Sequence, residues 1–170
     1  MQDKPHLERL VNINKVSIFA EIGVLRGFTT LHLLSRCPSI TKYYAIDPWI
    51  LTPEYSGGPL QLSDLSFDNW YMDIKEKTKP FESKLIMIRK FSQDALHDIP
   101  DKSLDMVFID ANHSYEEVKK DILGWRNKVR VGGILSGHDY HIDGVKRAVN
   151  EISKNEYELL GLDLWWMKNK

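Results

Sequence analysis

The stretch FAEIGVLRGFTT, residues 19–30, constrains the fold more than any other part of this sequence. It overlaps an apolar, β-branched run, Val16–Ile22, that is typical of a buried strand. Gly23 and Gly27 then bracket a tight turn, and a helical apolar pattern begins at Thr29. A strand, a glycine loop and a helix in this order let a ligand approach bare backbone and the N–H groups of a helix N-terminus.

The acidic residue in this stretch separates it from phosphate-binding loops. The spacing is Glu-x-Gly-x-x-x-Gly, with Glu21 inside the end of the strand, and not the Gly-x-Gly-x-x-Gly of dinucleotide-binding folds. A carboxylate here would repel a phosphate and suits a cationic or amine-bearing ligand. An ordinary β–α turn that needs glycine for packing would have the same sequence, so the loop alone leaves both interpretations open.

The same alternation of strand and helix continues along the chain. Further strands are expected at 43–47, 84–90, 104–110 and 131–137, and helices at 3–14, 29–36, 64–79, 92–98, from about 115 and from about 143. Two last strands, 156–160 and 162–167, are separated by Gly161 and predict a tight hairpin. This order predicts an α/β fold in one domain, 1–170, with a mostly parallel seven-stranded sheet, a C-terminal antiparallel hairpin and helices on both faces.

Polar side chains follow several predicted strands at the edge where ligands bind in open α/β sheets. They are Glu21, Asp47, Ser92, Asp110 and Asp139. Asp47 lies 20 positions beyond Gly27, about the distance at which an acid binds the ribose hydroxyls in nucleotide folds. Capping of the turn before Pro48 is the alternative role for Asp47.

A second group of polar residues lies in FIDANHSYEEV and GGILSGHDY. Asp110 ends one predicted strand and His113 follows three positions later, while His138 and Asp139 end the next strand. Neighbouring strand ends would bring Asp110 and Asp139 close enough to share one cation, and carboxylate oxygens suit Mg²⁺ or Mn²⁺. Structural roles remain as alternatives: a helix-capping His113, a structural His138 and an Asx-turn Asp139.

Composition excludes several classes of function. The 170 residues carry a net charge of −1, which gives no general affinity for nucleic acid or an anionic membrane. No apolar run approaches the roughly 20 residues that span a bilayer. The start of the chain, MQDKPHLERL, lacks the apolar block of a signal peptide. The single cysteine, Cys37, cannot form an internal disulfide, so we expect a reducing, cytoplasmic location.

Taken together, these motifs resemble the class I S-adenosylmethionine (SAM) methyltransferases. The loop after Glu21 resembles their motif I, and AIDPW, FIDANHSYEEV and GGILSGHDY follow in the order expected of that superfamily. Among its members the chain resembles the metal-dependent small-molecule O-methyltransferases of the catechol type and of the macrolide-sugar and aminocoumarin-sugar type. The resemblance extends from about Val16 to Met167.

The resemblance implies a Rossmann-like methyltransferase fold and a set of site residues. SAM would be bound by Glu21, Gly23, Gly27, Asp47, Ser92, Gln93 and Asp110. In particular, Ser92 and Gln93 match the adenine-contacting turn of the catechol-type enzymes. A divalent metal, Mg²⁺ or Mn²⁺, would be held by Asp110, Asp139 and His138, and His113 would act as the general base beside Asp110. His138 departs from the family pattern, in which an acid is common at that place, so the identity of the metal is open.

The implied function is methyl transfer from SAM to a small-molecule acceptor, most simply at a hydroxyl oxygen. A catalytically silent SAM-binding or assembly module and an NAD(P)-dependent oxidoreductase are the alternatives. Many relatives carry extra N-terminal helices over the acceptor. The loop 49–63 or a second subunit of a homo-oligomer would have to supply that cover here.

Overall fold

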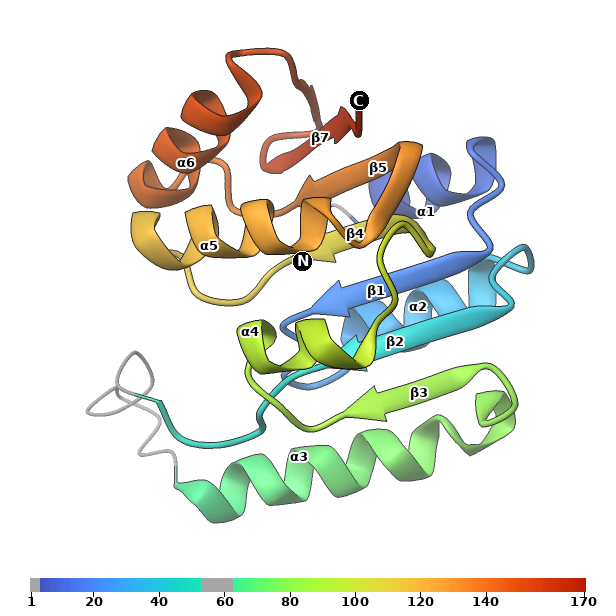
Figure 1. The fold of residues 1–170 in the computed structure, drawn as a ribbon. Coiled ribbons are helices and arrows are strands. Elements are labelled where there is room, and N and C mark those ends of the chain that lie inside the picture. Colours follow the sequence, from blue (N-terminus) through green and yellow to red (C-terminus); the bar gives the residue numbers. More distant parts are fainter. Residues whose placement is uncertain (1–3, 53–62) are drawn as a thin grey trace.

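The computed structural model describes residues 4–52 and 63–170 and contains one seven-stranded sheet in the order β3-β2-β1-β4-β5-β7-β6 (Figure 1). The strands are β1 Ile18–Ile22, β2 Lys42–Ile46, β3 Leu85–Ile88, β4 Leu104–Ile109, β5 Val129–Gly137, β6 Glu158–Leu160 and β7 Leu164–Lys168. The first five are parallel, and β6 and β7 form an antiparallel hairpin beside β5. The predicted sheet and its closing hairpin are confirmed.

Helices cover both faces of this sheet (Figure 1). They are α1 Lys4–Ile13, α2 Phe28–Arg36, α3 Asp64–Lys77, α4 Ser92–Ala95, α5 Tyr115–Arg126 and α6 Asp143–Ser153, with 3₁₀ turns at Lys79–Phe81 and Leu96–Asp98. Within the described ranges, no helix combines the length and apolar character needed to cross a bilayer.

Alternating side chains of the central strands divide the core into two layers. In β1, Phe19 packs with α1, α2 and α3, while Ala20 and Ile22 pack with α4, α5 and α6. In β4, Phe108 and Val107 follow the same alternation. Because each layer buries one apolar face of the sheet, the polar strand ends are confined to the carboxyl edge.

Several predicted element details are wrong for identifiable reasons. Strand β5 begins at Val129, two residues before the prediction, because Gly132 at φ 74° forms an irregularity inside the strand rather than at its entrance. The helical pattern predicts Leu65 on the buried side of α3, yet Leu65 is 67% exposed and Phe67 is buried instead.

Two serines whose positions in the sequence predict helix caps do not cap through their side chains. Ser92 precedes a helical pattern and is expected as an N-cap, but it is the first residue of α4, and the N-cap is Phe91. Ser114 and Glu117 have the spacing of a capping box, but the Ser114 side chain makes no capping hydrogen bond, although Ser114 is the N-cap of α5. Asn112 takes over instead, because its side-chain oxygen accepts a 2.8 Å hydrogen bond from the Ser114 N–H.

Gly23 is the point at which three strands converge on the glycine loop. Its N–H donates to the carbonyl of Ile46 at 2.9 Å, and its φ is 88°. A Cβ built on Gly23 would overlap the backbone carbonyl of Asp110 at the end of β4. Glycine is therefore required here both for the left-handed backbone and for the close approach of two loops.

Glu21 lies beside this convergence and is only 1% exposed. Its Oε2 accepts a hydrogen bond from the Thr30 hydroxyl and one of 2.6 Å from the Tyr43 hydroxyl. Burial raises the pKa of Glu21 to about 8 despite these two bonds, with smaller contributions from the charges of Asp110 and Asp47. The carboxyl group is therefore largely neutral at pH 7 as long as no cation lies beside it.

Gly23→Ala should destabilise the domain by about 2–5 kcal/mol, because it combines a steric overlap with a left-handed alanine. Gly132→Ala is the matched control. Its φ is similar, but the nearest atom to its added Cβ is a side-chain nitrogen of Arg130 at 3.8 Å. That variant should lose only about 1–2 kcal/mol. Urea unfolding of both variants checks this, and equal losses would contradict the close approach.

Glu21→Gln should remove a pH dependence of stability. Since folding raises the pKa of Glu21 from 4.5 to about 8, unfolded chains release this proton at lower pH than folded chains do. The wild type should therefore lose on the order of a few kcal/mol as pH rises from about 4.5 to 8. Denaturant unfolding across this range should give a flatter profile for Glu21→Gln. As a control, Glu158→Gln at an exposed position should give the same pH profile of stability as the wild type. A wild-type profile for Glu21→Gln as well would contradict the prediction.

Candidate functional site

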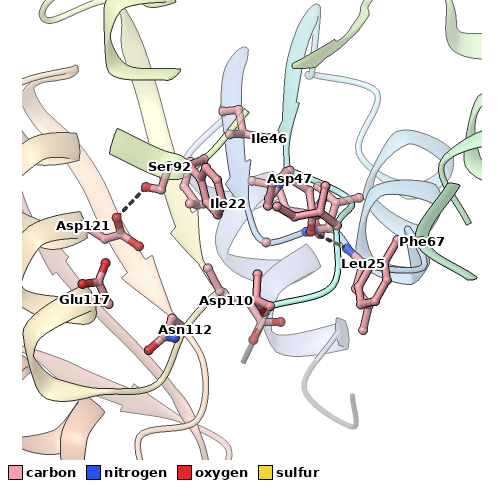
Figure 2. Close-up of a pocket in the computed structure, with 18 of the residues that line it drawn as sticks. Ile22, Leu25, Ile46, Asp47, Phe67, Ser92, Asp110, Asn112, Glu117 and Asp121 are labelled. Atoms are coloured by element: carbon pink, nitrogen blue, oxygen red, sulfur yellow. Dashed lines mark hydrogen bonds between the residues drawn. The ribbon is translucent and has the colours of Figure 1, made fainter. Parts of the chain in front are cut away.

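A cavity of about 630 Å³ opens at the carboxyl edge of β1, β2 and β4 (Figure 2). Its wall combines the glycine loop, the ends of these strands, α4 and one side of α5. The polar lining residues are Glu21, Arg26, Thr29, Asp47, Thr52, Ser92, Gln93, Asp110, Asn112, His113, Glu117 and Asp121. Four of the five predicted strand-end residues thus meet in one cavity, and Asp139 lies next to it through its contact with His113.

Asp47 is engaged by the protein itself. Its Oδ2 accepts 2.9 Å hydrogen bonds from the N–H groups of Val24 and Leu25, and its Oδ1 accepts a 2.7 Å bond from Trp49 N–H. Burial nevertheless raises the pKa of Asp47 above its usual value. Asp47 therefore does cap the turn before Pro48, as its alternative role requires. The same carboxylate also holds the glycine loop against the end of β2.

The loop after β2 begins as a packed segment. Trp49 is fully buried at φ 44°, contacts Tyr71 of α3 and donates a 3.0 Å hydrogen bond from its indole to the Leu25 carbonyl. Trp49 therefore packs the loop onto the body and does not line the cavity. The loop 49–63, expected from the sequence to cover the acceptor, lies mostly outside the described residues.

Gly27 has a different role from Gly23. It is the N-cap of α2 at φ 68°, and a Cβ there would lie 2.8 Å from the side chain of Ile74 in α3. Gly27 is outside the cavity wall, whereas Gly23 is part of it. Its requirement for glycine comes from the packing of α2 against α3.

A chain of hydrogen bonds fixes α4 against α5. Asp121 Oδ1 accepts from the Ser92 hydroxyl and, at 2.8 Å, from Gln93 Nε2. The indole N–H of Trp125 donates to the Ser92 oxygen at 2.8 Å. Burial raises the pKa of Asp121 to about 6, and the two accepted bonds oppose that rise. Figure 2 shows Ser92 and Asp121 joined at one end of the cavity, away from Leu25 and Phe67.

The predicted acid–histidine group is assembled at the ends of β4 and β5. His113 Nε2 lies 2.8 Å from Asp139 Oδ2 and 4.0 Å from Asp110 Oδ1. Asp110 and Asp139 together raise the pKa of His113 to about 9, and the neighbouring histidines His113 and His138 hold the pKa of Asp139 well below its usual value. One ligand atom from each of Asp110, His113 and Asp139 lies within 4.8 Å of the other two, which suits one metal ion.

His138 lies on the opposite side of Asp139. Its Nδ1 is 3.0 Å from Asp139 Oδ1, and it groups with Asp139 and Asp163 instead of with Asp110. Asp163, in the turn of the β6–β7 hairpin, is also 2.7 Å from His141 Nδ1. The ligand set expected from sequence, with His138 beside Asp110, is therefore divided over two groups that share Asp139.

Sequence reasoning misses two partners of the site residues. The first is Asp121, for which an acid between the buried Val118 and Trp125 on one helix face is a usable signal. The second is Tyr43, since nothing local marks this strand residue as the partner of Glu21. Both pairings depend on elements far apart in the sequence.

The sequence matches a family model described as a methyltransferase domain over residues 20–140. It is also 34% identical over 136 residues to an uncharacterised protein, y4gI, of Sinorhizobium fredii. That alignment covers 78% of this chain but only 14% of the relative, so the chain spans a small part of that protein's length.

Solved structures with the same fold include two that carry the cofactor or its product. An O-methyltransferase from Bacillus cereus in complex with S-adenosylhomocysteine (SAH) has a TM-score of 0.70 at 14% identity, covering 97% of this chain and 79% of that one. TomG from Streptomyces achromogenes, an O-methyltransferase involved in tomaymycin synthesis, in complex with SAM, has a TM-score of 0.69 at 12% identity, with coverages of 99% and 80%.

A Staphylococcus aureus protein assigned as a caffeoyl-CoA O-methyltransferase has a TM-score of 0.72 at 15% identity, covering 99% of this chain and 83% of that one. At such identities these structures establish the fold, while the sequence match establishes the family. The cavity also lies at the sheet edge where this fold places its ligands. This chain belongs to the methyltransferase domain family and has the class I SAM-dependent methyltransferase fold.

Proposed function

We propose that this chain transfers the methyl group of SAM to a hydroxyl oxygen of a small molecule, and that a divalent metal ion assists the transfer. The observation that carries the proposal is the continuity of one cavity, which joins the glycine loop to Asp110 and His113. A cofactor bound along the loop would thus have its reactive end near groups that can orient and deprotonate an acceptor. The family assignment leaves the oxidoreductase alternative without support.

The charge of the cavity supports a cationic cofactor. Among the described residues, its lining carries five acids, Glu21, Asp47, Asp110, Glu117 and Asp121, and one arginine, Arg26. Glu21 is largely neutral by itself because burial raises its pKa to about 8. A nearby positive charge favours the ionised carboxylate, so Glu21 would supply its charge when the amino or sulfonium group of SAM is present. We place Glu21 near the methionine amine or ribose, with Gly23 and Asp47 beside the ribose.

The residues at the ends of β4 and β5 fit a divalent ion by their chemistry. Asp110 and Asp139 offer carboxylate oxygens that suit Mg²⁺ or Mn²⁺, and the ring nitrogen of His113, within 4.8 Å of both, would lie beside the ion as the base. When bound, such an ion would lower the pKa of an acceptor hydroxyl. His138 would act on the site through Asp139, to which it is paired.

His113 is the residue proposed to take the acceptor proton. When no cation is bound beside Asp110 and Asp139, these carboxylates raise the pKa of His113 to about 9, so the ring is protonated at pH 7. It can serve as a base only when these carboxylates are neutralised by another cation, because their charges are what raise its pKa. The proposed base and the proposed metal ligands are thus coupled through the same two carboxylates.

The remaining wall of the cavity would position the acceptor. Phe28, Ile50, Leu51 and Phe67 line it with apolar surface. Such surface suits an acceptor with an aromatic or otherwise apolar body, and orientation against the methyl group would supply much of the rate enhancement.

We predict that SAH binds this chain and that NAD does not. The acid at the end of β1 favours a cationic or uncharged ligand over a pyrophosphate, and the loop lacks the dinucleotide glycine spacing. Calorimetric titration of both compounds checks this prediction. Micromolar binding of NAD without binding of SAH would reject the proposed cofactor.

Asp110→Ala and His113→Ala should separate metal binding from proton transfer. Loss of Asp110 should abolish both Mn²⁺ binding and methyl transfer, because one fewer carboxylate leaves too little charge to hold the ion. Loss of His113 should slow transfer by roughly 10²–10⁴-fold while Mn²⁺ binding persists. Mn²⁺ binding is measured by electron paramagnetic resonance, and transfer by release of labelled methyl groups from SAM to a panel of small hydroxylated compounds.

The exposed His97→Ala is the control for the histidine variant and should behave as the wild type. Full transfer in the presence of a chelator would reject the metal. SAM binding without transfer to any acceptor, with Mn²⁺ present, would favour the catalytically silent module.

A further inference from the structure

Asp121 is a buried carboxylate for which the proposed chemistry has no use. It lies on α5 among the apolar residues Val118, Ile122 and Trp125, and is 4% exposed. A carboxylate in such a place is costly unless hydrogen bonds compensate its lost hydration. Asp121 also forms part of the cavity wall, so its unused acceptor capacity is available to a ligand.

The hydroxyl group of Ser92 already donates and accepts hydrogen bonds within the protein. That hydroxyl donates its only proton to Asp121 Oδ1, and its oxygen accepts the indole N–H of Trp125. Both partners belong to α5, while α4 is a single turn of four residues that cannot fix its own position. Ser92 is therefore a positioning residue that sets α4 against α5, and its side chain is not the group that faces a ligand.

The orientation of the Gln93 amide follows from the same carboxylate. Gln93 Nε2 donates to Asp121 Oδ1 at 2.8 Å, and the flipped amide would bring two acceptor oxygens together. Gln93 Oε1 then lies toward α5, 3.5 Å from a Cβ built on Gly124. The second oxygen of Asp121 points away from Ser92 toward the interior of the cavity (Figure 2). The cavity end formed by α4 and α5 thus presents an acceptor from Asp121 and no side-chain donor from Ser92.

We propose that Asp121 is the specificity-determining residue for the purine of the cofactor, and that its free oxygen accepts a hydrogen bond from the exocyclic amino group of adenine. The inference rests on the proposed function, since it takes SAM as the ligand. An amino group supplies the donor that this oxygen requires. Hypoxanthine carries a carbonyl oxygen at the same place, which would face the Asp121 carboxylate without a proton between them.

The test compares SAH with S-inosylhomocysteine, which differs from it only in this amino group and the adjoining ring proton. Calorimetric titrations at pH 7.5 use the full chain, its Asp121→Asn variant and the Asp94→Asn control. Asp94 is an exposed acid of α4 outside the cavity wall. The wild type and Asp94→Asn should prefer SAH by roughly 10- to 100-fold. In Asp121→Asn the preference should fall below about threefold, because an amide can donate to the carbonyl of hypoxanthine.

A second measurement needs no variant and so does not depend on the folding of Asp121→Asn. SAH labelled with ¹⁵N at the amino group is bound to the wild type and observed by NMR. A hydrogen bond to a carboxylate should separate the two amino protons and move one of them downfield. A single averaged resonance, as in the free compound, would overturn the inference.

The outcomes distinguish this inference from the function on which it rests. Failure of the wild type to bind either compound would reject the proposed cofactor. Binding of SAH with equal affinity for S-inosylhomocysteine, or an unchanged preference in folded Asp121→Asn, would overturn the role of Asp121 alone.

Discussion

The burial of carboxyl groups along one edge of the sheet is the constraint on which the rest of the site depends. Glu21, Asp47 and Asp121 are each less than a tenth exposed, and each is compensated by hydrogen bonds from a different element. Glu21 ties β1 to β2 and α2, Asp47 ties β2 to the glycine loop, and Asp121 ties α4 to α5. The ligand cavity lies between these three carboxyl groups, whose positions are fixed by their hydrogen bonds.

The periodic features of the sequence are sufficient to predict the architecture. Apolar strands alternating with helices predict the sheet, and the short Gly161 link predicts the hairpin. Because parallel strands end at the same edge, the polar residues after β1, β2 and β4 can also be placed together from their positions in the sequence alone. Asp110, His113 and Asp139 are brought into contact for this reason, although their chemical roles remain proposals.

The features that sequence does not predict depend on tertiary partners. Ser92 has the chemistry of an N-cap, yet its hydroxyl is drawn to Asp121 and Trp125, which lie about 30 positions further along. Gly132 could mark a turn or an irregularity within a strand, and only the register against β4 distinguishes the two. Sequence order groups His138 with Asp110, but in the structure His138 lies against Asp139 Oδ1 and groups with Asp163, which is contributed by the closing hairpin.

The close approach at Gly23 has a mechanical consequence. Gly23 bonds to the end of β2 and touches the carbonyl of Asp110, whose own N–H donates to Ile22 at 2.8 Å. No side chain lies between the two loops to absorb a displacement. The glycine loop and the backbone at the end of β4 are therefore in direct contact, so a displacement of one is resisted by the other.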